Sequence, residues 1–205
     1  MTRTGKTLLI IAGAVVCISI IAAAIVVFNP FAAPEEEIAW NLTLQGAGGE
    51  VKTLTFSEIK ALPASEGIGG FFTTVGIVNG PYRCRGVPVK DLCELVGGVE
   101  PANTVWVSAP DGYLMVFSYE QLQGAFRTFE PTSFKEVPHE DLTLVLSYEQ
   151  DGAPLSEYDG KPLRIALVST RGDYLTEGHY WVKWVDTIEV HTPAMAQSVG
   201  ENVTG

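Results

Sequence analysis

The chain has 205 residues and a formal net charge of −11, with 24 acidic residues against 13 basic ones. An excess of negative charge of this size repels the phosphate backbone, which excludes nucleic acid as an expected partner. The length accommodates one membrane-spanning element and one globular domain. Three cysteines are too few for a disulfide scaffold.

Residues 8–28 form an uncharged stretch of 21 apolar or small residues. A helix of that length spans roughly 30 Å, about the thickness of a bilayer core. Arg3 and Lys6 precede it and glutamates 35–37 follow it. The positive-inside rule therefore predicts a single-pass cell-membrane protein with residues 1–7 in the cytoplasm and its domain outside the cytoplasm. A cleaved signal peptide stays open as the alternative, although the apolar region of such peptides is usually shorter.

A linker with two prolines and three acids, at residues 29–37, separates this segment from the outer domain. Turn signals and alternating apolar residues predict a domain at 38–192, and the small, polar residues 193–205 predict a frayed tail. The outer part carries 11 basic against 24 acidic residues, a net charge of −13. Anionic lipid headgroups are therefore not expected to attract it.

Many short strands and a few short helices are expected in this domain. The helices are expected to begin at Ser57, as a serine cap, and to lie within residues 86–96 and 119–125. This pattern predicts an α+β, mixed or antiparallel β-rich domain rather than a doubly wound parallel sheet. The expected strands are residues 38–44, 51–56, 71–78, 82–85, 105–109, 114–118, 142–148, 163–168 and 184–190.

Two dipeptides predict hairpin turns. Asn79-Gly80 is expected to connect the strands at 71–78 and 82–85, and Asp111-Gly112 is expected to connect the next pair. Tyr113 follows the second turn, and a structural role is favoured for it, with a place at the edge of a pocket as the alternative.

Three motifs follow one another near the C-terminus. They are DGAPL at 151–155, DGKPLR at 159–164 and VKWVDTIEV at 182–190. Two turn-plus-strand units and an alternating strand, in this order and spacing, resemble the molybdopterin-binding domain of sulfite-oxidase-like oxidoreductases. The resemblance extends back to Trp40, and it implies the fold of that domain, a molybdopterin cofactor and redox chemistry on a small substrate.

The resemblance also assigns residues to the cofactor. In that family the run His-Gly-x-Pro-Leu-Arg ends in an arginine that binds the cofactor's phosphate, which corresponds to Arg164 here. A glycine followed five residues later by Lys-Trp lines the family's pocket, which corresponds to Gly178, Lys183 and the backbone of Val182. A planar guanidinium suits phosphate because it pairs with two oxygens at once. From the residues alone, Arg164 is equally a surface arginine paired with an acid, and Lys183 a solvated side chain.

Two positions depart from the family's pattern. The cysteine that binds molybdenum there falls near Thr74 here, and a neutral hydroxyl is a poor ligand for a redox metal. Asp159 stands where the family has histidine, and a carboxylate repels a phosphate unless it is protonated or paired. No catalytic residue and no metal ligand is therefore assigned.

Cys84 and Cys93 lie outside the predicted membrane segment, where an oxidising exterior would permit a disulfide. Cys93 belongs to the apolar face of a short helix, which favours separate, buried thiols. Cys84 lies between Arg83 and Arg85, which would favour a thiolate. Because alternation places both arginines on the opposite face of a strand, a core position is favoured for Cys84, and a substitute metal ligand is the alternative.

Other chemistry finds little support. The three histidines have no zinc-ligand spacing, and there is no nucleotide-binding glycine loop or serine nucleophile elbow. Asn41 and Asn202 begin glycosylation acceptor patterns.

Two hypotheses about function follow from these features. The first is a membrane-anchored, extracytoplasmic molybdopterin-binding domain that exchanges electrons with a redox partner protein. The second is a non-catalytic module that kept the fold, lost the metal site and binds a small ligand or a partner.

Overall fold

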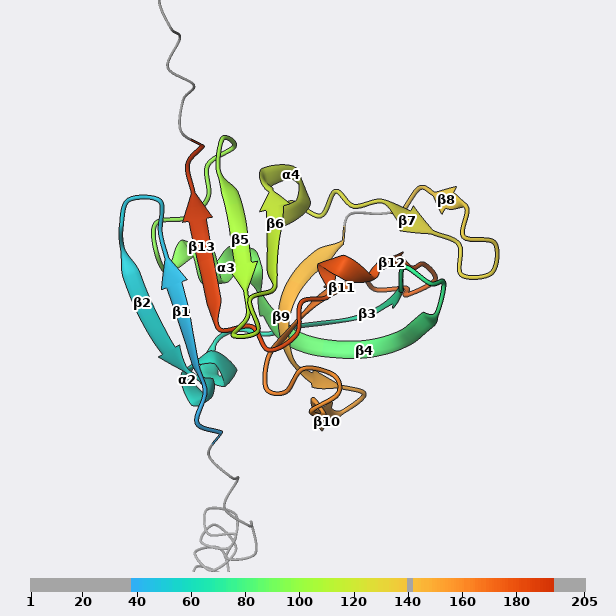
Figure 1. Ribbon diagram of the computed structural model, residues 1–205, viewed down its shortest axis with the longest axis horizontal. Coiled ribbons are helices and arrows are strands. Elements are labelled where there is room, and N and C mark those ends of the chain that lie inside the picture. Colours follow the sequence, from blue (N-terminus) through green and yellow to red (C-terminus); the bar gives the residue numbers. More distant parts are fainter. Residues whose placement is uncertain (1–37, 140–141, 194–205) are drawn as a thin grey trace, which may run out of the picture. The chain divides into compact units, whose positions relative to one another are not determined.

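The computed structural model describes residues 38–139 and 142–193 (Figure 1). The predicted membrane segment at 8–28 and the linker at 29–37 lie outside the described residues, as do residues 194–205 of the predicted tail. Among the helices of the described ranges, none is long and apolar enough to cross a bilayer. The described ranges belong to a unit that begins at Ile38.

One sheet has five strands in the order β2-β1-β13-β5-β6. β1 and β13 are parallel, and the other pairs are antiparallel. Thr43 lies opposite Thr187, so the first and last strands of the domain meet in the interior of this sheet (Figure 1). The bounds are β1 Asn41–Gln45, β2 Val51–Thr55, β5 Thr104–Ser108, β6 Leu114–Ser118 and β13 Thr187–His191.

The second sheet has the order β10-β9-β4-β3-β12, and β11 also pairs with β9. β3 and β12 are parallel, and the long strand β4 is antiparallel to both β3 and β9. A separate pair joins β7 and β8. The bounds are β3 Ser65–Phe72, β4 Val78–Pro88, β7 Thr128–Phe129, β8 Glu136–Val137, β9 Thr143–Gln150, β10 Ala153–Pro154, β11 Arg164–Val168 and β12 Thr176–Glu177.

A single apolar core joins the two sheets. α3 lies between them, because it contacts β4 and β9 of one sheet and β1 and β13 of the other. Its residues Val89, Leu92 and Cys93 are buried. The remaining helices are short: α2 Phe56–Ala61, α4 Tyr119–Leu122 and the 3-10 helix η1 Gly178–Tyr180, beside α3 Val89–Glu94. The expected β-rich architecture with few short helices is confirmed.

The expected start of the first helix is wrong by two residues. Thr55, rather than Ser57, caps α2, because its hydroxyl accepts the Glu58 N–H at 3.2 Å. The Glu58 carboxylate in turn accepts the Thr55 N–H at 2.8 Å, which completes a capping box. The pattern Thr-x-x-Glu at 55–58 was therefore the stronger signal.

The expected hairpin turn at Asn79-Gly80 is also wrong. β4 runs through both residues, and the chain reverses earlier, where the Thr73 N–H donates to the Ile77 carbonyl at 2.9 Å. Gly80 has a φ of +99°, and the β3–β4 register shifts between Gly69 and Phe71. The glycine thus serves an irregularity inside a strand, which has the same dipeptide signature as a turn.

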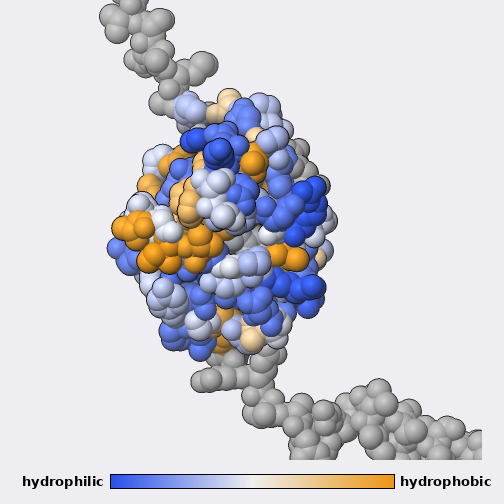
Figure 2. All heavy atoms as spheres, turned by 90° about the vertical axis from the view of Figure 1, so that its right-hand side faces the viewer, coloured by the Kyte–Doolittle hydropathy of each residue, from blue (hydrophilic) through white to orange (hydrophobic). Residues whose placement is uncertain are grey.

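The true turn between β3 and β4 is largely apolar and exposed. Val75, Ile77 and Val78 expose 78%, 60% and 42% of their surface. Figure 2 views the domain from the end where this turn lies and shows apolar surface gathered there.

The expected strand at 184–190 begins later than predicted, at Thr187, because Trp184 has a left-handed φ of +55° that a strand does not accommodate.

The cysteine predictions are confirmed. Cys84 and Cys93 are both free and buried, so the disulfide alternative does not hold. Arg83 and Arg85, on either side of Cys84 in β4, are exposed, as alternation along a strand requires.

Candidate functional site

A pocket of about 320 Å³ opens beside the second sheet. Strands β3 and β4, the turn after β5, the loop before β11 and the segment from η1 to Trp184 all contribute to its wall. Its aromatic and polar lining differs from the aliphatic core behind it. The lining residues are Phe71, Thr73, Asn79, Tyr82, Asp111, Tyr113, Tyr158, Asp159, Arg164, Gly178, Trp181, Val182, Lys183 and Trp184.

Two chain segments that run side by side bring the predicted cations together. The Ile165 N–H donates to the Val182 carbonyl at 2.8 Å, and the Val185 N–H donates to the Leu163 carbonyl at 3.0 Å. Between these bonds, the backbones of Arg164 and Lys183 form an isolated antiparallel β-bridge. Both cations line the same pocket, as the resemblance requires.

Arg164 is almost completely buried, with only 1% of its surface exposed. Its Nη2 donates to Oε1 of Gln150 at 2.7 Å, and its Nη1 lies 3.4 Å from the carbonyl oxygen and 3.5 Å from Oδ1 of Asp159. Its Nε has no hydrogen-bond partner within the described part of the chain. A buried, unpaired donor costs about 1–3 kcal/mol, so this arginine is poised for a further acceptor.

Lys183 approaches the pocket from the adjoining segment. Its Nζ donates to the Tyr158 carbonyl and lies 4.3 Å from the centre of the Tyr158 ring. Burial lowers the pKa of Lys183, and the nearby positive charge of Arg164 lowers it further, while Asp159 opposes the shift. An anion placed between the two cations would relieve their repulsion.

Aromatic rings surround the guanidinium. The Arg164 Cζ lies 5.0 Å from the Trp181 ring centre and 5.6 Å from that of Tyr82, which are cation–π distances. Trp181 is fixed in turn, because its indole N–H donates to the Thr176 hydroxyl at 2.8 Å. Burial lowers the pKa of Arg164, but the ordinary value is so high that the side chain stays charged at neutral pH.

The carboxylate of Asp159 is held between a serine hydroxyl and the Arg164 guanidinium. Its Oδ2 accepts a 2.5 Å hydrogen bond from the Ser156 hydroxyl, and its Oδ1 faces Arg164. The turn that contains Asp159 and Gly160 is tight, because a Cβ added to Gly160 would lie 2.6 Å from the Lys183 Cβ. Glycine at this position therefore permits the close approach of the loop to Lys183.

Gly178 also lines the pocket and has no room for a side chain. A Cβ there would lie 2.9 Å from the Phe72 carbonyl oxygen. The backbone of Val182 lies at the pocket, but its N–H already donates to the Tyr180 carbonyl at 3.0 Å. A ligand could use that amide only by replacing this bond.

Thr74 is the one predicted site residue that the structure places elsewhere. It is exposed in the β3–β4 turn and borders a separate shallow depression, whereas its neighbour Thr73 lines the pocket. Thr73 Oγ1 accepts the Ile77 N–H at 3.1 Å, so this hydroxyl also stabilises the turn.

Several pocket residues were not predicted from sequence. Tyr82, Tyr158 and Asp111 lie far apart in the chain, and no local pattern connects them. Tyr113, for which a structural role was favoured, does both: it lines the pocket, and its hydroxyl donates to the His179 carbonyl at 2.8 Å, which ties the turn after β5 to η1.

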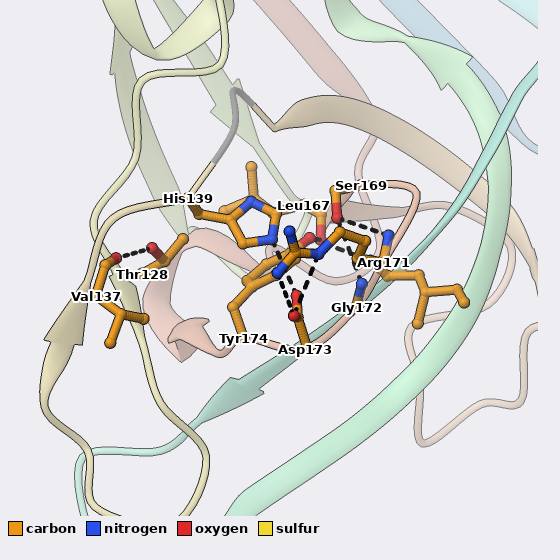
Figure 3. Close-up of polar contacts among 10 residues, drawn as sticks. Thr128, Val137, His139, Leu167, Ser169, Arg171, Gly172, Asp173 and Tyr174 are labelled. Atoms are coloured by element: carbon orange, nitrogen blue, oxygen red, sulfur yellow. Dashed lines mark hydrogen bonds and ion pairs between the residues drawn. The ribbon is translucent and has the colours of Figure 1, made fainter.

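A second polar cluster lies at the loop after β11 and does not line the pocket (Figure 3). Asp173 accepts from the Arg171 Nη2 at 2.5 Å and lies 3.2 Å from the His139 Nε2. The hydrogen bonds from Arg171 in particular lower the pKa of the Asp173 carboxyl. Tyr174 packs on the His139 ring and donates to the Leu167 carbonyl, so the cluster anchors the loop to β11.

Comparison with known proteins shows the family. Residues 30–198 match the family described as the oxidoreductase molybdopterin binding domain. The chain belongs to this family. It is 22% identical over 174 residues to the uncharacterized oxidoreductase YuiH of Bacillus subtilis (strain 168), over 83% of this chain and 76% of that protein. The resemblance inferred from the C-terminal motifs is therefore confirmed.

A solved structure shares the fold. The sulfane dehydrogenase SoxCD from Paracoccus pantotrophus superimposes with a TM-score of 0.58 at 15% identity, over 76% of this chain. The match spans only 39% of that longer chain. Identity this low supports the shared fold alone.

The pocket fits one end of the family's cofactor better than the other. The unpaired Nε of buried Arg164, beside Lys183, matches the needs of a phosphate. No sulfur atom of the described residues lines the pocket, and they contain no cluster of histidine, cysteine and acidic side chains that could hold a metal. Cys84 is fully buried beside Arg164, and burial raises the pKa of its thiol to about 11. These residues thus suit the phosphate but offer no thiolate to a metal.

Proposed function

We propose that this domain binds a molybdopterin cofactor in the pocket lined by Arg164 and Lys183 and belongs to a redox enzyme acting on a small substrate. The observation that carries the proposal is the buried guanidinium, whose Nε lacks an acceptor and whose neighbour is a second cation. Family membership favours this reading over a non-catalytic binding module.

The residues of the chain have distinct tasks in this proposal. Arg164 and Lys183 bind the phosphate, and the cofactor's metal, when bound, supplies the capacity for electron exchange. Trp181 and Tyr82 hold the guanidinium in place and exclude water from it. The aromatic rings of Tyr158 and Trp184, which lie 4.3 and 5.9 Å from the Lys183 Nζ, give the pocket walls against which a planar pterin ring can stack.

The test is a measurement of bound cofactor. The full chain is purified from a host that makes molybdopterin, and pterin is measured by fluorescence after oxidation, with molybdenum and tungsten measured by elemental analysis. We expect close to one pterin per chain, and its loss in an Arg164→Met variant. An Arg83→Met variant is the matched control, because Arg83 is exposed and pairs with Glu66 at 2.8 Å away from the pocket. A pterin-free wild type, with a related enzyme from the same cells fully loaded, would refute the proposal.

We further propose that residues 8–28 anchor the protein in the cell membrane, with the domain outside the cytoplasm and a redox partner protein at the membrane surface. The support is the uncharged 21-residue stretch and the charges that flank it. Sodium carbonate extraction tests the anchor, and protease treatment of intact spheroplasts tests the orientation. Release by carbonate, or protection of the domain from protease, would contradict this proposal.

A further inference from the structure

The two pocket cations are already engaged by one short loop of the chain. Residues 156–161 precede β11, and two of their carbonyls face the cations. The Tyr158 carbonyl accepts from the Lys183 Nζ, and the Asp159 carbonyl lies 3.4 Å from the Arg164 Nη1. The loop therefore already supplies one carbonyl acceptor to each of the two cations.

Asp159 adds a negative charge to this loop. Its Oδ1 lies 3.5 Å from the Arg164 Nη1, which is long for a charge-assisted hydrogen bond. Its other oxygen is held by the Ser156 hydroxyl at 2.5 Å, so the carboxylate is fixed at a distance from the guanidinium instead of closing on it. The ion pair is consequently loose, although Arg164 itself is 99% buried.

We infer that Asp159 is an internal counterion that an anionic ligand has to replace on Arg164, and that this residue sets the affinity of the pocket for phosphate. The inference rests on the proposed function for the identity of the ligand. An incoming phosphate gains the two cations that line the pocket. It also meets the carboxylate of Asp159 within the same pocket, and like charges at such distances oppose one another appreciably where water is partly excluded.

Removal of the Asp159 charge should therefore strengthen phosphate binding. Inorganic pyrophosphate serves as the probe, and the full chain in detergent is titrated by calorimetry at low ionic strength. We expect Asp159→Asn to bind pyrophosphate at least about fivefold more tightly than the wild type. Structural damage would weaken binding, so a gain in affinity identifies the electrostatic role. Asp159→His is a second uncharged variant at pH 8 in case the asparagine variant does not fold.

A neighbouring acid provides the matched control. Glu157 is exposed on the same loop and lies 3.5 Å from Lys161, outside the pocket lining. Glu157→Gln removes the same charge, and we expect its affinity to change by less than about twofold because solvent screens it. Unchanged or weaker binding by Asp159→Asn and Asp159→His would overturn the inference, as would an equal gain in Glu157→Gln.

The two proposals fail in different ways. A chain without pterin refutes the proposed function, yet tighter pyrophosphate binding by Asp159→Asn would still support the role of Asp159. A loaded chain whose Asp159 variants bind pyrophosphate no better refutes only the counterion role.

Discussion

Arg164 is a buried cation in the pocket lining, with 1% of its surface exposed. Its Nη2 donates to the Gln150 side chain, its Nη1 faces the Asp159 loop, and its buried Nε has no hydrogen-bond partner within the described residues. A lysine keeps the charge but has a single compact donor group. In the proposed function the arginine serves both the loop and the phosphate, which the single donor group of a lysine does not.

Arg164→Lys should reduce pyrophosphate affinity by about tenfold, because the ammonium replaces a planar fork that pairs with two oxygens. Calorimetric titration measures the loss. Arg83→Lys, at an exposed ion pair with Glu66, should leave affinity unchanged. Equal affinities of Arg164→Lys and wild type would show that only charge matters.

The two buried thiols make the domain sensitive to alkaline pH. Burial raises the pKa of Cys84 to about 11 and that of Cys93 to about 12, from an ordinary value of 9. Between pH 9 and these values the folded state keeps protons that the unfolded chain has lost. Unfolding then releases protons, so a rise in pH favours it.

We expect the free energy of unfolding to fall above pH 9 by about 1 kcal/mol per pH unit for each thiol. Urea denaturation at several pH values measures this slope. Cys93→Ala should reduce the slope, whatever it does to stability at pH 7. A slope identical in wild type and variant between pH 9 and 11 would contradict the assignment.

At the scale of the elements, capping decides where α2 begins. Thr55 and Glu58 exchange hydrogen bonds across the first turn, while Ser57 lies inside the helix and is exposed. A cap residue satisfies an otherwise unpaired backbone N–H, and a helical residue one position further does not.

Thr55→Ala should therefore cost about 1 kcal/mol of unfolding free energy, and Ser57→Ala should change it by less than about 0.5 kcal/mol. Both are measured by urea denaturation at pH 7. If Ser57→Ala lowered the free energy of unfolding more than Thr55→Ala, Ser57 would be the cap of this helix.

The strand β4 shows why turn signals mislead within this fold. Asn79-Gly80-Pro81 contains three turn-forming residues, yet it lies within an 11-residue strand. The strand passes so close to its neighbours that Gly86 has no space for a Cβ, which would lie 2.1 Å from the Leu146 carbonyl oxygen. Glycine is required here because the neighbouring strand leaves no room for a side chain. From a single sequence, a glycine required for close packing of strands looks the same as a glycine required for a turn.

At the scale of the whole molecule, the last strand, β13, completes the five-stranded sheet. β13 lies between β1 and β5, and its residues Ile188 and Val190 are buried in the common core. Asn103 also reaches Thr192, because its Nδ2 donates to the threonine hydroxyl at 2.9 Å. The chain up to residue 192 is therefore part of the folded structure.

A chain truncated after residue 193 should unfold cooperatively at the same midpoint as the full-length protein. Truncation after residue 186 removes β13, two buried aliphatic side chains and the ladders on both sides. That loss, at about 2–5 kcal/mol for each buried side chain, is comparable with the total stability of a domain. Circular dichroism during heating measures the transition of each truncated chain. We expect a cooperative transition for the chain that ends at residue 193 and none for the chain that ends at residue 186. A cooperative transition in the shorter chain would refute the role of β13.

The sequence by itself determined the family, the β-rich class and the two cations of the site. These rest on local features: alternation along strands, and motifs such as 159–164 whose residues are close neighbours in the chain. Only the tertiary structure decided that Asp159 is paired, that Cys84 is sealed beneath Arg164 and that Thr73, rather than Thr74, reaches the pocket. The burial of Cys84 depends on the register of β4 with β3 and β9, because a shift of one residue turns a side chain to the other face of a sheet. The pairing of Asp159 depends on the folded conformation of the loop before β11.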